Sequence, residues 1–326
     1  MGRIQRRQFL LSAGALLAIP RRASAQQSAK IWRIGYITAG GPRASYLDEL
    51  RKAMRDLGYE AGKNYVIELQ VANGKYERLP ALAADLVKRN VDVIVGIGTP
   101  AINATKRATS SIPIVMALVG DPVASGFVAS LARPGGNVTG LSLANTDISS
   151  KWLELARTVA PGSRIGALAD SNQSTVKWHL KNIQNAAQKL GIELPVVFAP
   201  AANDIESALA SLARERVTTM IVLPSAMFTF NAAQIAQAAV KLRIASIATS
   251  RDYVESGLLL SYGQNYHAFV RRSAIYIDKI FKGANPGDLP VEQPTLFELV
   301  INQATARQLD LPIPKELLLR AHEVVE

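Results

Sequence analysis

The sequence contains no cysteine and only three histidines among its 326 residues. Without cysteine no disulfide can form, no thiolate can bind a metal, and no lipid can be attached through sulfur. His179, His267 and His322 are isolated, and none lies in an H-x-x-x-H or H-E-x-x-H arrangement. We therefore expect no metal site and no cofactor, and we interpret each histidine as a surface or capping residue.

The sequence motifs of common enzyme classes are also missing. There is no G-x-S-x-G elbow and no Walker loop, and no Ser-His-acid set can be assembled. The stretch Val95–Ala101 (VGIGTPA) contains two glycines of a dinucleotide-binding fingerprint, but Ala101 replaces the third. No acid ends the next strand-like run either. We predict neither catalytic residues nor a pyrophosphate site.

Clusters of like charge are scarce, although the formal net charge is +11. Basic residues alternate with acidic ones, as in residues 48–52 (DELRK) and 214–216 (RER). Such mixed runs are typical of solvated helix faces rather than of a nucleic-acid-binding stripe. We expect no binding of nucleic acid.

The first 25 residues have the pattern of a signal peptide. Arg3, Arg6 and Arg7 precede an apolar run, Phe9–Ile19, and the small residues 23–25 (ASA) follow. The run is too short to cross a bilayer, which requires about 20 residues. The stretch 5–11 (QRRQFLL) resembles a twin-arginine export signal. We predict cleavage after Ala25 and release into the periplasm.

Cleavage would also remove much of the excess positive charge. Five of the 37 basic residues and none of the acidic ones lie in this segment, so the formal net charge falls from +11 to +6. The remaining chain is long enough for two domains of ordinary size.

Short apolar runs alternate with amphipathic runs along this remaining chain, which predicts parallel sheets covered by helices on both faces. The first series of expected strands comprises Ile31–Ile37, Tyr65–Val71, Val91–Ile97, Ile114–Val119 and Val138–Leu143. The second comprises Arg164–Ala169, Leu194–Phe198, Thr218–Leu223 and Ala245–Thr249. A third domain does not fit into the last 70 residues or so, which hold the strands Leu258–Tyr262 and Leu296–Ile301 around the helix Ala268–Lys282.

We therefore predict an α/β protein with two doubly wound, parallel-sheet lobes joined by three crossovers. Residues 31–141 and 263–290 are assigned to lobe 1, and residues 142–262 and 291–326 to lobe 2. Three crossovers indicate a hinge with a cleft between the lobes, which is a common place for a small ligand to bind.

Polar and aromatic residues follow the expected strands at their carboxyl ends, the edge where open α/β sheets bind ligands. The candidates are Thr38, Gly98, Thr99, Pro100 and Asp121 in the first lobe, and Asn172, Ser225, Phe228 and Tyr262 in the second. Every turn has a second interpretation, because Thr99-Pro100 and Asp121-Pro122 are also good helix starts. Free N–H groups at a helix start attract a carboxylate too, so the two roles are compatible.

Several longer segments resemble the periplasmic solute-binding proteins of ABC transporters, in the branch of the tryptophan- and tyrosine-binding receptors. They are residues 34–36 (IGY), 95–101 (VGIGTPA), 119–123 (VGDPV), 133–140 (RPGGNVTG), 257–263 (GLLLSYG), 289–295 (LPVEQPT) and 297–302 (FELVIN). The resemblance implies a type I periplasmic-binding fold, a small ligand closed between the lobes, delivery to an ABC permease in the inner membrane, and no catalysis.

The resemblance also implies roles for individual residues. Gly98 and Thr99 would receive a ligand carboxylate, and Asp121 would meet an ammonium group. Asn172, Ser225 and Tyr262 would close over the ligand from the other side. Phe228 and Tyr262 would add apolar faces. Where several relatives carry longer polar side chains after the first strand, residues 38–42 read TAGGP, so that a larger or aromatic acid could fit.

We predict a monomeric receptor for a small carboxylate, such as an aromatic or branched amino acid. Two alternatives stay open at this point. One is an exported α/β enzyme that uses Asp121 and Asp170 as an acid pair. The other is a sensor subunit that presents its bound state to a signalling partner.

Overall fold

The computed structural model describes residues 30–41, 44–143, 148–173, 175–293 and 295–326. Residues Ile31–Glu326 form one compact unit. The predicted signal peptide lies outside the described residues. Within the described residues, no helix combines the length and the apolar character needed to span a membrane.

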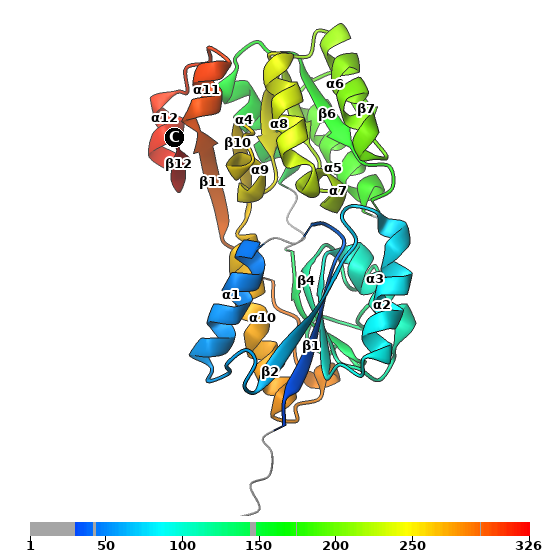
Figure 1. The fold of residues 1–326 in the computed structure, drawn as a ribbon. Helices are drawn as coiled ribbons and strands as arrows, with labels where there is room; N and C mark the ends of the chain where they lie inside the picture. Colours follow the sequence, from blue (N-terminus) through cyan, green and yellow to red (C-terminus); the bar gives the residue numbers. More distant parts are fainter. Residues whose placement is uncertain (1–29, 42–43, 144–147, 174, 294) are drawn as a thin grey trace, which may run out of the picture. The chain divides into compact units, whose positions relative to one another are not determined.

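The first lobe is built on a five-stranded parallel sheet in the order β2-β1-β3-β4-β5 (Figure 1). Its strands are β1 (Trp32–Thr38), β2 (Tyr65–Val71), β3 (Val93–Ile97), β4 (Ile114–Val119) and β5 (Val138–Ser142). Strands β3 and β4 are buried along almost their whole length, as expected for central parallel strands with helices on both faces.

Four helices cover the two faces of this sheet. They are α1 (Ala44–Asp56), α2 (Leu79–Lys88), α3 (Thr99–Ala108) and α10 (Tyr266–Phe281), with a short 3₁₀ turn, η1 (Tyr76–Arg78), before α2. The apolar faces of α1 and α10 pack together on one side, and those of α2 and α3 form a separate core on the other. The lobe is therefore completed by a helix that follows it by more than 100 residues in sequence.

The second lobe contains a seven-stranded sheet in the order β12-β11-β10-β9-β8-β6-β7. Its strands are β6 (Ile165–Ala169), β7 (Val196–Phe198), β8 (Thr219–Val222), β9 (Ala245–Ala248), β10 (Leu260–Gln264), β11 (Phe297–Asn302) and β12 (Glu323–Val325). Its helices are α4 (Ser149–Val159), α5 (Val176–Lys189), α6 (Ile205–Arg214), α7 (Ala226–Phe230), α8 (Ala232–Lys241), α9 (Arg251–Glu255), α11 (Gln303–Gln308) and α12 (Lys315–Arg320). The short 3₁₀ turn η2 (Ala202–Asp204) also belongs to this lobe, whereas η3 (Pro286–Asp288) packs against β5 of the first lobe.

The chain crosses between the sheets after β5, after β10 and before β11. Two of these segments are joined by backbone hydrogen bonds, from Ser142 N–H to Glu292 C=O at 2.9 Å and from Glu292 N–H to Gly140 C=O at 3.0 Å. The predicted fold class, two doubly wound lobes joined by three crossovers, is confirmed.

One edge of the second sheet departs from the predicted parallel arrangement, because β10 and β11 are antiparallel. After β10 the chain crosses to the first lobe, where α10 packs, and it then returns to the second lobe. Strand β11 therefore starts at the end where β10 stops and has to run in the opposite direction. The antiparallel pairing of β10 with β11 is a local departure from the predicted parallel sheet, whose other strand pairs among the described residues are parallel.

Candidate functional site

Two adjoining cavities lie where the carboxyl ends of strands from both sheets face each other. The first chamber has a volume of about 800 Å³ and the second chamber of about 1020 Å³, part of each open to solvent. The first chamber includes Thr38, Thr99 and Gln173, and the second includes Asp121, Trp152 and Phe297. The chambers share a wall of seven residues, Gly120, Leu143, Thr175, His179, Pro224, Thr249 and Tyr266, so they form one continuous site.

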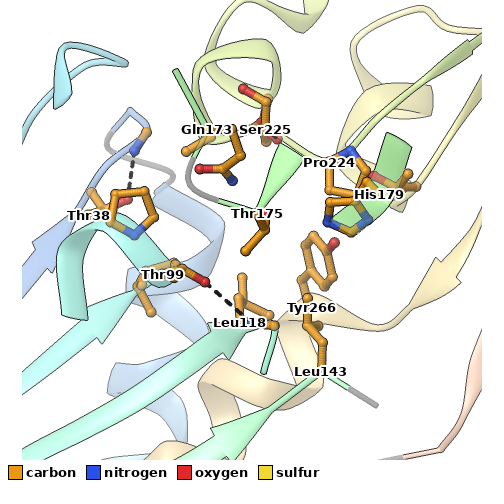
Figure 2. A pocket seen from close by; sticks show the side chains of 18 of the residues that line it. Thr38, Thr99, Leu118, Leu143, Gln173, Thr175, His179, Pro224, Ser225 and Tyr266 are labelled. Carbon is orange, nitrogen blue, oxygen red and sulfur yellow. Dashed lines mark hydrogen bonds between the residues drawn. The ribbon is translucent and has the colours of Figure 1, made fainter. Parts of the chain in front are cut away.

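The first lobe contributes the start of α3 to the first chamber (Figure 2). Gly98 precedes the helix with φ of 87°, a conformation that favours glycine, and Pro100 occupies the first turn. The hydroxyl oxygen of Thr99 accepts a hydrogen bond from the Gly120 N–H at 3.4 Å. The hydroxyl proton of Thr99 can therefore be donated to another acceptor. Pro100 has no N–H, so Thr99 supplies the main donors at this helix start.

Strand β4 ends in a strained turn beneath the first chamber. Leu118 has φ of 58°, which is unfavourable for a bulky residue, and the register between β4 and β5 shifts between Met116 and Val119. Leu118 lines the first chamber. Bulges and left-handed residues cost energy and often occur at binding sites, where they redirect a side chain.

The second lobe contributes the segment that leads into α5. Gln173 and Thr175 lie over the first chamber, and His179 follows Thr175 by one helical turn (Figure 2). The buried side-chain oxygen of Gln173 has no hydrogen-bond partner within the described part of the chain. Because a buried amide without a partner is unfavourable, a polar ligand group is the natural complement of Gln173.

His179 lies in the wall that the two chambers share. Burial lowers the pKa of His179 to about 4, so the imidazole is neutral at pH 7 and can both donate and accept a hydrogen bond. The interpretation of this histidine as a surface or capping residue is wrong. The ring of Trp178 lies edge-on to the imidazole, with ring centroids 4.9 Å apart.

The second chamber has an aromatic lining and one acidic group. Trp152, Trp178, Tyr266 and Phe297 line it together with Asp121. Asp121 Oδ1 accepts hydrogen bonds from the N–H groups of Val123 at 3.1 Å and Ala124 at 2.9 Å. The aspartate therefore caps the following turn and lines the chamber at the same time.

The structure brings only some of the candidate residues to this site. Thr38, Gly98, Thr99, Pro100 and Ser225 line the first chamber, and Asp121 lines the second. Phe228 is completely buried in the core of the second lobe, and Tyr262 stacks on Phe297 with ring centroids 5.7 Å apart. Asn172 is exposed, and its side chain donates to the Pro200 carbonyl at 3.0 Å. None of these three lines either chamber.

Ser225 takes part in a buried network that joins the two lobes. Its hydroxyl donates to Asp170 Oδ2 at 2.7 Å and accepts from the Phe228 N–H at 3.1 Å. Tyr76 of the first lobe donates to the same Asp170 oxygen at 2.9 Å. Asp170 is only 1% exposed and lines neither chamber. The network holds the lobes together beside the first chamber.

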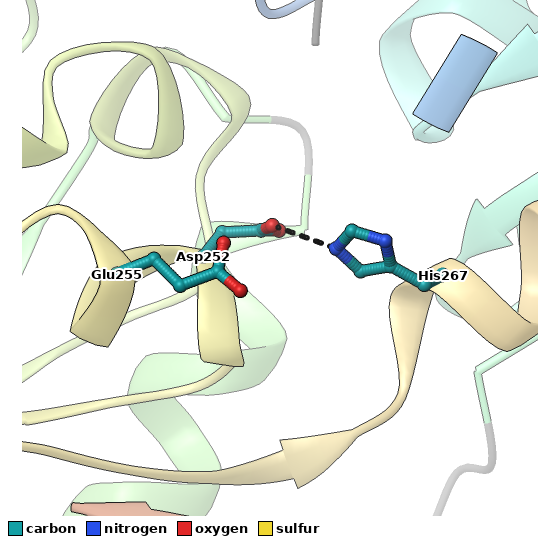
Figure 3. A group of neighbouring side chains, drawn as sticks. All are labelled: Asp252, Glu255 and His267. Atoms are coloured by element: carbon teal, nitrogen blue, oxygen red, sulfur yellow. Dashed lines mark ion pairs between the residues drawn. The ribbon is translucent and has the colours of Figure 1, made fainter. Parts of the chain in front are cut away.

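The lobes meet again at Asp252 of α9. Its carboxylate accepts a hydrogen bond from Tyr46 of α1 and forms an ion pair with His267 of α10 at 3.5 Å (Figure 3). Asp252, Glu255 and His267 could each offer an atom to a cation. However, Glu255 is paired with Arg251 at 3.0 Å, and Asp252 is bonded across the cleft. These ion pairs account for the cluster, and we assign no metal to it.

Gly40 and Gly41, which follow β1, allow close contact with the second lobe, a role that the sequence did not indicate. A Cβ on Gly41 would lie 2.3 Å from the ring of Phe230, and a Cβ on Gly40 would lie 3.4 Å from the Ala226 carbonyl oxygen. Both neighbours belong to α7 of the second lobe. The small residues therefore let α7 approach the first lobe, besides lining the first chamber.

Sequence reasoning missed the residues of the shared wall. Thr175 and His179 lie one turn apart on one helix face, a spacing that could have drawn attention to them. Tyr266 follows the second crossover, and burial raises the pKa of its phenol, which stays neutral. No sequence pattern around Leu118 predicts its place in the site, because its positive φ arises from the register shift with β5.

Comparison with known proteins identifies relatives over most of the chain. The family model described as ABC transporter substrate binding protein matches residues 38–325. A tyrosine-binding protein of Clostridioides difficile (strain R20291) is 30% identical over 263 residues, which cover 80% of this chain and 75% of the relative.

Two solved structures share the fold across nearly the whole chain. A conserved domain protein of Vibrio cholerae superposes with a TM-score of 0.82 at 29% identity, covering 90% of this chain and 100% of the other. The ABC domain from Streptococcus pneumonia in complex with L-Trp superposes with a TM-score of 0.81 at 26% identity, covering 91% and 100%.

Proposed function

The chain belongs to the ABC transporter substrate-binding protein family, and from this premise we propose that it is the periplasmic receptor of an ABC importer. The receptor acts as a monomer, captures a small carboxylate-bearing ligand in the two chambers, and delivers it to a permease in the inner membrane. The observation that carries the proposal is the continuous site between the carboxyl ends of strands from both sheets.

The start of α3 is the proposed carboxylate site. The positive end of the helix dipole, the first-turn N–H and the hydroxyls of Thr99 and Thr38 all favour an anion there. No lysine or arginine is among the described residues that line either chamber. The carboxylate would therefore be held by dipoles and neutral donors rather than by an ion pair.

An amino acid is the ligand class that the relatives support. The tyrosine-binding protein and the structure with L-Trp carry aromatic amino acids in their descriptions. In this chain, Asp121 would meet the ammonium group and the aromatic residues of the second chamber would surround an apolar side chain. Closure of the lobes would bury the ligand and create the surface that the permease recognises.

The enzyme alternative required Asp121 and Asp170 to act as a pair. Asp170 is buried, bonded to Tyr76 and Ser225, and absent from the lining of both chambers. These contacts favour a receptor that closes on its ligand without converting it.

The first test is mass spectrometry of the ligand that accompanies the purified protein, followed by titration of small carboxylates. We expect a raised melting temperature and recovery of the unchanged ligand. Thr99→Ala with Asp121→Ala should abolish binding of an amino acid, whereas the control pair Thr158→Ala with Asp56→Ala, away from the site, should bind normally. Turnover products would contradict the receptor, and unchanged affinity in the first double variant would contradict the site.

A further inference from the structure

We propose that the second chamber binds an organic cation, a substituted ammonium group on a ligand whose carboxylate lies in the first chamber. The inference rests on the proposed function, because it assumes that the two chambers hold one ligand. It keeps the carboxylate site of that function but differs from its amino-acid assignment, because an alkylated ammonium group takes the place of the α-ammonium and the apolar side chain in the second chamber.

Four aromatic side chains from four different elements of the chain meet in the second chamber. They are Trp152 of α4, Trp178 of α5, Tyr266 of α10 and Phe297 of β11. The face of an aromatic ring carries partial negative charge and attracts a cation that lies against it. Rings that converge on one cavity from several sides are the arrangement that binds alkylated ammonium groups.

Two of these rings are held in place by contacts outside the chamber. The indole N–H of Trp152 donates to the Tyr262 carbonyl oxygen at 2.8 Å. Phe297 stacks on the ring of Tyr262, with an angle of 16° between the ring planes. Because the rings are fixed before a ligand arrives, little conformational entropy is lost when one binds.

The charges around the second chamber favour a cation. Asp121 is the one acidic residue among the described residues that line it, and no described lysine or arginine lines it. Both hydrogen bonds to Asp121 go to Oδ1, so that Oδ2 can face a positive group.

The titratable neighbours do not counteract this attraction. Burial lowers the pKa of His179 to about 4, so at neutral pH the imidazole adds no positive charge to the chamber wall. Burial also raises the pKa of Tyr266, so its phenol stays protonated. At pH 7 the charge that faces the chamber from described residues is that of Asp121.

The lining suits a substituted ammonium better than a primary one. A primary ammonium has three N–H donors, each of which needs an acceptor after water is removed. Ring faces are poor acceptors, but they match the diffuse charge of alkylated nitrogen.

Two carboxylates of the same shape test the proposal directly. In 4-(trimethylammonio)butanoate the terminal group is cationic, and in 5,5-dimethylhexanoate a carbon atom replaces the nitrogen. We expect calorimetric titration of the full mature protein to give at least tenfold tighter binding of the cationic compound. Equal or tighter binding of the neutral compound would overturn the cation site and leave the carboxylate site of the proposed function intact. Binding of neither compound would also overturn the cation site, whereas the proposed function is judged separately by the co-purified ligand.

Variants then show whether the preference comes from this chamber. Trp178→Leu and Asp121→Asn should each reduce the ratio of the two affinities at least threefold. Phe198→Leu, which alters a similarly exposed aromatic residue on the edge strand β7, should leave the ratio unchanged. A ratio that stays the same in both chamber variants would contradict the assignment, and circular dichroism spectra of the variants check that each is folded.

Discussion

At the scale of single residues, the first chamber presents neutral polar groups. Thr38 and Thr99 bring hydroxyls, Gln173 brings an amide, and His179 brings an imidazole that burial keeps uncharged. Such groups bind a ligand through directional hydrogen bonds, so each loses much of its value if the ligand lacks the matching atom. The polar side chains of the first chamber therefore contribute more to the choice of ligand than to the overall binding free energy.

His179 should make the stability of the protein depend on pH. Its pKa is about 4 in the folded chain and near 6.5 when unfolded, so the unfolded state binds the proton more readily. The stabilising effect of the neutral form is complete above about pH 6.5 and decreases as the pH falls toward 4, by roughly 3 kcal/mol at most. Urea unfolding at several pH values should show a flatter curve for His179→Gln between these limits. A parallel curve for the variant would contradict the assigned burial.

Gln173 should matter for binding but not for folding. Replacement by leucine removes the buried amide oxygen that has no partner among the described residues, so the free energy of unfolding should stay the same or rise slightly. Affinity for the natural ligand should fall about tenfold, corresponding to one lost hydrogen bond of about 1.4 kcal/mol. Gln188→Leu, at an exposed position of α5, is the control and should bind normally. Calorimetry and thermal unfolding together measure both effects.

At the scale of elements, the end of β4 shapes the floor of the site. The register shift against β5 places Leu118 in a left-handed conformation, and it depends on close contact with Gly140 opposite. Gly140 has φ of 123°, and a Cβ there would lie 2.3 Å from the Met116 carbonyl oxygen. The two strands can meet in this way only because one residue lacks a side chain.

Gly140→Ala should therefore be strongly destabilising. The added methyl group meets backbone rather than a flexible side chain, and the backbone conformation is unfavourable for alanine, so we expect a loss of about 3 kcal/mol. Gly136→Ala, four residues earlier at an exposed position with open space around it, should change stability by less than about 0.5 kcal/mol. Comparable denaturation midpoints for the two variants would show that the contact between β4 and β5 is not required.

At the scale of the whole molecule, the lobes are joined by polar bonds that involve no ligand. Tyr76 reaches Asp170 on one side, and Tyr46 and His267 reach Asp252 on another. In the proposed closure of the lobes, each of these bonds would form only in the closed state and would contribute to the free energy of closure. Because ligand affinity includes that free energy, residues that never touch the ligand should influence its binding.

Tyr76→Phe tests this coupling. Loss of the hydroxyl removes the bond to Asp170 at 2.9 Å, and we expect affinity to fall about fivefold, with a larger radius of gyration in the absence of ligand. Tyr59→Phe is the matched control, because its hydroxyl bonds Asp278 at 3.0 Å within the first lobe. Small-angle scattering and titration measure the two quantities, and identical results for both variants would show that Tyr76 does not influence closure.

The sequence by itself determined the alternation of strands and helices and the division into two lobes. It also determined the family, and the family model confirms that resemblance. These features depend on local periodicity and on short segments, both of which can be recognised without contacts. It also drew attention to Thr99 and Asp121, because each lies two residues after the end of a buried strand. Strand ends in a parallel sheet share one edge, so this inference needs no coordinates.

Only the tertiary structure decided which side chains meet at that edge. Ser225 and Phe228 follow the same strand, yet one lines the first chamber while the other is in the core, because the short helix α7 turns them to different sides. His179 and Tyr266 enter the site from different helices, although they are more than 80 residues apart in the sequence. The direction of a side chain and the meeting of distant segments depend on how the elements pack, which a local pattern does not encode.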